Sequence, residues 1–199
     1  MRYTPCGGHV DILKQRILAE GRNLGHGILK VDSFVNHQVD PALMHACAKE
    51  LAQRFRSQNV TRVLTAEISG IAPALLTALE LGVPVVYARK HKPITMPESV
   101  FLTTAPSHTK GVDVNLMASP EYLSAGERVL IIDDFLATGQ TILGLARLAQ
   151  AAGSMIVGVG AVIEKTFEGG REALKPLGVP VESLAVIVDM REGKIVFQD

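Results

Sequence analysis

The 199-residue chain has only two cysteines and no net charge, and each of these shortages excludes a class of protein. The cysteines, Cys6 and Cys47, are too few for a disulfide-stabilised scaffold and lack the CxxC spacing of a zinc site. We therefore interpret them as free thiols in a reducing compartment. Twenty basic residues balance twenty acidic residues, so no overall electrostatic field favours binding to nucleic acid or to an anionic membrane.

Long apolar segments are also missing from the chain. No stretch reaches the ~20 apolar residues that cross a bilayer, and the opening "MRYTPCGGHVD" is too polar for a secretory signal. We therefore expect a cytoplasmic protein that binds no membrane. The length and the 47% hydrophobic content favour one domain over residues 10–199, preceded by a flexible tail over residues 1–9.

From residue 61 onward, apolar strand-like segments alternate with helix-like segments. Several of the strands are apolar on both faces, which is typical of an α/β fold with a mostly parallel sheet flanked by helices. Asp40 and Pro41 predict the start of a helix, and Gly82 predicts the end of another. The predicted helices cover 10–20, 70–82, 141–153 and 171–178, with one more beginning at 40–41; the predicted strands cover 61–67, 83–89, 127–134, 155–164, 181–188 and 194–197, with a short irregular strand within 28–34.

Residues 91–127 combine prolines and hydroxyl side chains with weak periodicity. A stretch of that length inside a compact domain is usually functional. We interpret it as a candidate lid over an active site, although it could also contain a hairpin.

The stretch "VLIIDDFLATGQT" places two acidic residues, Asp133 and Asp134, at the carboxyl end of a predicted strand, where ligands bind in parallel sheets. The small residues that follow lead into a helix whose free N–H groups favour an anion. Gly139 allows close backbone approach, and Thr138 and Thr141 can add hydroxyl donors. A phosphate beside acceptors for hydroxyl groups predicts a ribose 5-phosphate site. An acid pair at this position could instead hold magnesium, as in response-regulator-like folds.

The whole motif resembles the 5-phosphoribosyl-1-pyrophosphate (PRPP) signature of the type I phosphoribosyltransferases. The resemblance covers about residues 10–197 and extends to the bacterial xanthine enzymes, which are relatives of the adenine enzymes. It implies a small hood built from N-terminal and C-terminal segments, with residues 24–40 as its main part, and a lid over the active site. The segments that carry the resemblance are "ILKVDSFVNHQVDP", "ISGIAPALLTALELGVPVVYARKHKP", "VLIIDDFLATGQ" and "VIEKTFEGGRE".

In this family two acidic residues contact the ribose hydroxyl groups, and the turn after them holds the 5-phosphate. The resemblance therefore implies catalytic roles for Asp133 and Asp134. The residues that it assigns to the PRPP-binding turn are Ala137, Thr138, Gly139, Gln140 and Thr141.

A loop and a basic cluster match the positions that hold the diphosphate in the family. Without the resemblance, "EISGI" could be an ordinary strand-to-helix turn capped by Ser69, and "ARKHK" could be a solvated strand end. The implied diphosphate-binding residues are Glu67, Ile68, Ser69 and Gly70, with Arg89 or Lys90 reaching the diphosphate, commonly across a dimer interface.

Four further positions match the purine site of the family. An ammonium group at Lys165 would donate to an exocyclic oxygen, which favours oxopurines over adenine. Phe167 could stack on the base or belong to the core. The implied purine-binding residues are Leu29, Asn36, Lys165 and Phe167.

The resemblance implies transfer of the 5-phosphoribosyl group from PRPP to N9 of xanthine by a homodimer. Mg²⁺ would be carried by PRPP, with no direct protein ligand assigned. Hypoxanthine, guanine or adenine as the base remains an alternative, because one hydrogen-bond inversion can decide the preference. A PRPP-responsive regulator that binds nucleic acid is a more remote alternative, since the balanced charge offers no basic excess.

Overall fold

The computed structural model describes residues 9–106 and 113–198. The predicted tail lies outside these residues except for His9, where the first helix begins. The α-helices are α1 (His9–Glu20), α2 (Pro41–Phe55), α3 (Ile71–Leu81), α4 (Gln140–Ala151) and α5 (Gly170–Leu174). The strands are β1 (Arg22–Asn23), β2 (Leu29–Lys30), β3 (Arg62–Ala66), β4 (Val85–Ala88), β5 (Phe101–Pro106), β6 (Asp113–Ala118), β7 (Arg128–Leu136), β8 (Met155–Lys165), β9 (Val181–Asp189) and β10 (Val196–Phe197).

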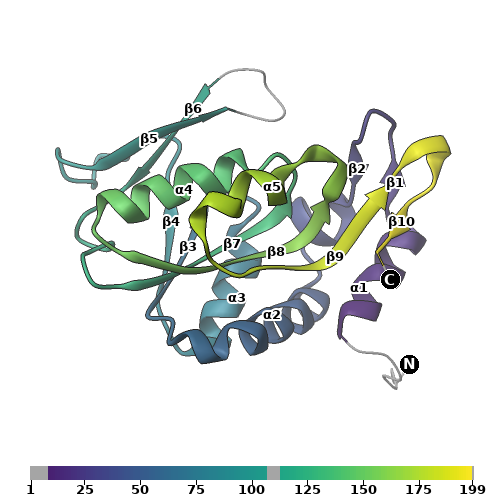
Figure 1. Ribbon diagram of the computed structural model, residues 1–199, viewed down its shortest axis with the longest axis horizontal. Coiled ribbons are helices and arrows are strands. Elements are labelled where there is room, and N and C mark those ends of the chain that lie inside the picture. The colour runs from purple at the N-terminus through teal and green to yellow at the C-terminus, as the bar shows by residue number, and fades with distance from the viewer. Residues whose placement is uncertain (1–8, 107–112, 199) are drawn as a thin grey trace.

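The main sheet has the strand order β10-β9-β8-β7-β3-β4. Every neighbouring pair in it is parallel except β10 with β9. Helices α4 and α5 lie on one side of this sheet, and α2 and α3 lie on the other (Figure 1). The predicted α/β fold, with a mostly parallel sheet flanked by helices, is therefore confirmed.

The aliphatic run of β7 divides its side chains between two cores. Leu130 and Ile132 belong to the cluster under α2 and α3, whereas Val129 and Ile131 belong to the cluster under α4. All four side chains are fully buried. Alternation along a strand sends successive side chains to opposite faces, so a central strand needs apolar residues at every position.

Short local signals start and stop the helices as the sequence predicts. The Asp40 carboxylate accepts hydrogen bonds from the backbone N–H groups of Ala42 (3.0 Å) and Leu43 (3.1 Å), which caps α2. Gly82 adopts a left-handed conformation with φ 70° and ends α3. These two residues fix the ends of helices that frame the sheet.

Several predicted boundaries differ from the structure by one or more residues, and two of the differences affect the site. The strand expected within 28–34 is limited to β2, and a π-helical turn follows at Asp32–Asn36 that buries Phe34 and Val35. Strand β7 continues two residues past its predicted end because Phe135 and Leu136 still pair with β8. The acid pair therefore lies within a strand.

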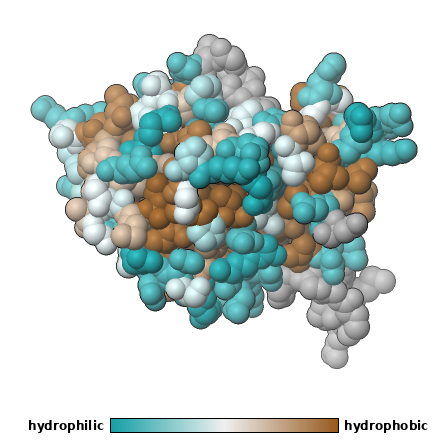
Figure 2. Space-filling view, viewed as in Figure 1, coloured by the Kyte–Doolittle hydropathy of each residue, from teal (hydrophilic) through white to brown (hydrophobic). Residues whose placement is uncertain are grey.

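The N-terminal and C-terminal parts of the chain meet beside the sheet, where β1, β2 and β10 lie close together (Figure 1). The side-chain amide of Asn23 donates to the carbonyl oxygens of Met190 and Lys194, the second at 3.0 Å. These bonds attach the β1–β2 hairpin to the segment between β9 and β10. Figure 2 shows hydrophobic residues gathered near the middle of this face of the molecule, with polar residues around them.

Candidate active site

A cavity of about 710 Å³ opens at the carboxyl ends of β3, β7 and β8. The β1–β2 hairpin, the β5–β6 hairpin and the start of α4 complete its walls. Thirteen of the residues singled out from the sequence line it: Leu29, Asn36, Glu67, Ser69, Lys90, Asp133, Asp134, Ala137, Thr138, Gly139, Gln140, Thr141 and Lys165.

The turn at 137–141 leads from β7 into α4. Gly139 has φ 77°, a left-handed conformation that favours glycine, and α4 begins at the next residue. Within the part of the chain that the structure describes, no side chain caps this helix start, so its first N–H groups keep their capacity to bind an anion. The start of α4 therefore offers main-chain N–H donors at the cavity, and binding of a phosphate there stays a prediction.

The two aspartates on β7 lie almost entirely inside the protein. Asp133 is 7% exposed and Asp134 is 6% exposed, and the Asp134 backbone N–H donates to the Asp133 carboxylate at 3.0 Å. Burial raises the pKa of Asp133 well above its usual range, and the adjacent Asp134 carboxyl raises it further. Buried carboxylates in such a setting gain from hydroxyl donors or a nearby cation.

Gly70 allows the loop after β3 to lie against this acid pair. A Cβ atom at Gly70 would lie 2.3 Å from the Thr65 hydroxyl oxygen and 2.8 Å from a carboxylate oxygen of Asp133. The absence of a side chain at Gly70 therefore allows the loop after β3 to pack directly against Thr65 and Asp133. Ile68 in the same loop is 76% exposed and is not among the lining residues.

The Glu67 carboxylate contacts both of the basic residues that follow β4. Its carboxylate accepts the Lys90 backbone N–H at 2.5 Å and pairs with the Arg89 guanidinium at 3.0 Å. Arg89 also lies over the Tyr87 ring, 5.7 Å from its centroid. Lys90 therefore lines the cavity, whereas Arg89 is not among the lining residues and pairs with Glu67.

The opposite end of the cavity contains Lys165 and Asn36. Lys165 is 6% exposed, donates to the Gly27 carbonyl oxygen at 2.9 Å and forms an ion pair with Glu168. The buried Oδ1 atom of Asn36 has no hydrogen-bond partner among the residues that the structure describes. Both side chains can therefore offer polar groups to a ligand.

An aromatic residue that sequence reasoning missed lies at this end. Phe135 lines the cavity, and its ring centroid is 5.9 Å from the Lys165 ammonium. Phe167 lies outside the lining, 46% exposed, and its ring approaches Gly27. Phe135 stands inside the quoted motif, next to the acid pair, and that position was its only signal. His26 and Ile28 from the β1–β2 hairpin also line the cavity without having been predicted.

Two features are absent from the described residues, 9–106 and 113–198. No group of three or more His, Cys, Asp or Glu side chains within them could hold a metal ion. In the same ranges no helix is both long and apolar enough to cross a bilayer.

Comparison with known proteins identifies relatives over most of the chain. Residues 36–194 match the family model of the phosphoribosyl transferase domain. A xanthine phosphoribosyltransferase of Stutzerimonas stutzeri is 47% identical over 190 residues, which is 96% of this chain and all of the relative. One of Leuconostoc mesenteroides is 50% identical over 188 residues, 94% of this chain and all of the relative.

A solved structure supports the same relationship. Adenine phosphoribosyltransferase from Rhodothermus marinus aligns with a TM-score of 0.72 and 28% identity, covering 90% of this chain and 98% of that one. The matched residues include the acid pair, the turn at 137–141 and the loop after β3, which lie within 36–194. The chain therefore belongs to the phosphoribosyltransferase family.

Proposed function

We propose that this protein transfers the 5-phosphoribosyl group of PRPP to N9 of xanthine in purine salvage. The observation that carries the proposal is the cavity itself, which joins an anion-binding turn, a buried acid pair and polar groups suited to an oxopurine. The relatives that share 47% and 50% identity with nearly the whole chain are named for the same activity.

The reaction exchanges one bond at C1 of the ribose. The bond from C1 to the diphosphate oxygen breaks, the bond from C1 to N9 forms, and N9 loses its proton. Xanthosine 5′-monophosphate (XMP) and pyrophosphate are the products. Positive charge develops on the ribose as the diphosphate leaves, so the protein must align both reactants, stabilise charge and exclude water.

The ribose 5-phosphate is placed at the turn formed by residues 137–141. Main-chain N–H groups at the start of α4 would bind the phosphate, and the helix dipole favours its charge. Asp133 and Asp134 would accept hydrogen bonds from the ribose hydroxyl groups. This arrangement fixes the sugar at two points, with C1 left accessible between the diphosphate and the base.

The leaving diphosphate is placed at the loop after β3. Glu67 and Ser69 line the cavity there, and Lys90 adds a positive charge from the end of β4. In this proposal the Arg89 guanidinium either holds the Glu67 carboxylate in position, or must separate from that carboxylate before it can contact the diphosphate. Ile68 and Gly70 contribute through the shape of the loop.

Mg²⁺ carried by PRPP fits the acid end of the cavity. Burial and the neighbouring carboxyl raise the pKa of Asp133, so a nearby cation would favour its charged form. When bound, Mg²⁺ neutralises negative charge on the diphosphate. No side chain is assigned as its direct ligand.

The base is placed between the β1–β2 hairpin and the end of β8. The Lys165 ammonium would donate to an exocyclic oxygen, and the Asn36 amide would pair with a ring N–H or a second oxygen. Phe135 offers an aromatic face and Leu29 an apolar one. In this proposal Phe167 closes the hood over the site from outside the cavity.

A lid and a small hood belong to the same proposal. Hood residues 24–40 include the β1–β2 hairpin, which lines the cavity. The candidate lid over 91–127 contains the β5–β6 hairpin, and Ala105, Pro106, Val114 and Leu116 from it line the cavity. The part of the lid at 107–112 lies outside the described residues.

We also propose a homodimer that uses α3 and the edge strand β4. Leu75 and Leu79 on α3 are 52% and 67% exposed, and Tyr87 on β4 is 41% exposed. Burial of such apolar side chains against a second copy would remove them from water. Arg89 and Lys90 follow β4 directly, and the family resemblance implies that one of them reaches the diphosphate across such an interface.

A cytoplasmic location is also part of the proposal, because free cysteine thiols are typical of a reducing compartment. Cys47 is a free thiol, and burial raises its pKa to about 12. Its proton is therefore retained at neutral pH, and the residue acts as part of the core.

The first test is base specificity with Mg²⁺ and PRPP. Pyrophosphate release should be fastest with xanthine, and kcat/KM for adenine should be lower by at least about 100-fold, since the adenine amino group cannot accept a hydrogen bond from Lys165. Substitution Lys165→Gln should reduce that preference while the KM for PRPP stays unchanged. Absence of pyrophosphate release with every purine base would contradict the proposal.

The second test is Asp134→Asn. Loss of a charged acceptor for the ribose should lower kcat/KM by about 10- to 100-fold, because hydrogen bonds to charged groups contribute about 1.5–3 kcal/mol. The melting temperature should stay within about 4 °C, since the side chain is not part of the apolar core. Unfolding of the variant with normal specific activity of its folded fraction would show that Asp134 has a structural role only.

The third test is the oligomeric state. Leu79→Asp places a charge in the proposed interface and should convert the dimer to a monomer in sedimentation experiments. The matched control is Leu18→Asp on α1, where an equally apolar side chain is 59% exposed and the dimer should persist. A wild-type protein that sediments as a monomer, or a Leu79→Asp protein that remains dimeric, would exclude this interface.

A further inference from the structure

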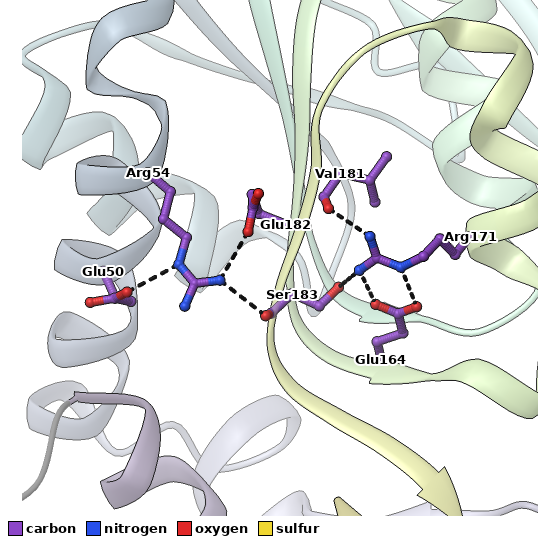
Figure 3. Close-up of polar contacts among 7 residues, drawn as sticks. All are labelled: Glu50, Arg54, Glu164, Arg171, Val181, Glu182 and Ser183. Atoms are coloured by element: carbon purple, nitrogen blue, oxygen red, sulfur yellow. Dashed lines mark hydrogen bonds and ion pairs between the residues drawn. The ribbon is translucent and has the colours of Figure 1, made fainter. Parts of the chain in front are cut away.

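Two arginines approach strand β9 from opposite sides of the sheet (Figure 3). Arg54 comes from α2 and contacts Glu50 at 3.0 Å, Glu182 at 3.0 Å and the Ser183 carbonyl oxygen at 3.3 Å. Arg171 comes from the first turn of α5 on the other side. Each arginine forms an ion pair with a glutamate and donates to a backbone carbonyl oxygen of β9. Only Arg171 is next in sequence to a residue, Gly170, that contacts the 137–141 turn.

The partner of Arg171 is a deeply buried carboxylate. Glu164 on β8 is 1% exposed, and its two oxygens accept from Nε (2.8 Å) and Nη2 (2.5 Å) of Arg171. Arg171 Nη1 also donates to the Val181 carbonyl oxygen at 2.7 Å. A buried carboxylate without its partner is costly, so this two-point contact holds the start of α5 against β8 and β9.

The residue before Arg171 touches the phosphate-binding turn. The Gly170 backbone N–H donates to the Ala137 carbonyl oxygen at 2.9 Å. A Cβ atom at Gly170 would lie 2.3 Å from that oxygen and 2.9 Å from the Gly139 nitrogen. A Cβ atom at Gly139 would in turn lie 3.1 Å from the Gly170 carbonyl oxygen. The two backbones are therefore in direct contact, and a shift of α5 must shift the turn.

The Gly170 hydrogen bond also fixes which way one peptide group faces. The peptide between Ala137 and Thr138 is trans, so its C=O and N–H groups point in opposite directions. Because the Ala137 oxygen is held toward α5, the Thr138 N–H points away from α5, and Thr138 lines the cavity. Rotation of this peptide would replace an N–H donor by a carbonyl oxygen, which repels phosphate.

We propose that Glu164 and Arg171 are positioning residues for the ribose 5-phosphate. Through α5 and Gly170 they hold the 137–141 turn in its phosphate-binding conformation without touching the substrate themselves. The inference rests on the proposed function, because it takes that turn as the 5-phosphate site. It adds that the pair serves the phosphate end of PRPP and XMP, and neither the diphosphate nor the purine.

The test compares Arg171→Gln with the matched control Arg54→Gln. The affinity for ribose 5-phosphate, measured by calorimetry, should fall at least about tenfold in Arg171→Gln, while the affinity for Mg²⁺–pyrophosphate changes less than about twofold. The KM for xanthine should also stay unchanged. Arg54→Gln should lower the melting temperature but retain the wild-type affinity for ribose 5-phosphate. Equal loss of that affinity in both variants, or no loss in Arg171→Gln, would overturn the inference.

A second variant keeps the test decisive if Arg171→Gln does not fold. Gly170→Ala leaves the ion pair intact but forces a Cβ atom against the Ala137 oxygen, so it should produce the same selective loss for ribose 5-phosphate. Unchanged affinity in Gly170→Ala would refute the connection between α5 and the turn.

A variant of the turn itself separates this inference from the proposed function. Gly139→Ala is strained by its φ of 77° and by the nearby Gly170 oxygen, and should weaken ribose 5-phosphate binding directly. If Gly139→Ala binds normally, the turn is not the phosphate site and the proposed function loses its basis. If Gly139→Ala loses affinity and both Arg171→Gln and Gly170→Ala keep it, only the positioning role is wrong.

Discussion

Parallel pairing of β7 with β3 on one side and β8 on the other constrains the rest of this molecule. Because the three strands run in the same direction, the Asp133–Asp134 pair, the loop after β3 and Lys165 all reach the same edge of the sheet. The register also sets Leu136 beside Glu164, one residue before the 137–141 turn begins. The cavity at this edge follows from these pairings, and its contents follow from the residues at the strand ends.

Two buried carboxylates in this region, Glu164 and Asp133, differ in how their negative charge is compensated. The negative charge of Glu164 is compensated by the Arg171 guanidinium, which donates to it through Nε and Nη2, so this carboxylate stabilises local structure. The Asp133 carboxylate accepts the Asp134 backbone N–H, and burial and the Asp134 carboxyl raise its pKa, although the positive charge of Lys90 acts to lower it. A carboxylate left without a full complement of donors is costly unless a ligand supplies them, which is typical of a functional site.

Local sequence signals predicted much of this arrangement. Asp40, Gly82 and the apolar run before Asp133 act through neighbours in the chain, and the structure agrees with each of them. The acid pair and the 137–141 turn also form one continuous segment, so their joint presence in the cavity could be predicted.

Other features depend on contacts between distant parts of the chain. The sequence did not decide between Arg89 and Lys90, because that depends on where the Glu67 carboxylate lies. The place of Phe135 depends on how far β7 continues, and the short length of β2 depends on its pairing with β1. The proposed role of Arg171 likewise depends on a contact between distant segments, the hydrogen bond from Gly170 to Ala137.

The most direct measurement is a crystal structure of the protein with XMP. The account predicts that the phosphoryl oxygens accept hydrogen bonds from main-chain N–H groups within 137–141, with the ribose hydroxyl groups at Asp133 and Asp134. The base should lie beside Phe135, within reach of Lys165 and Asn36. Nucleotide bound elsewhere in the cavity, with that turn empty and the acid pair free of the sugar, would contradict it.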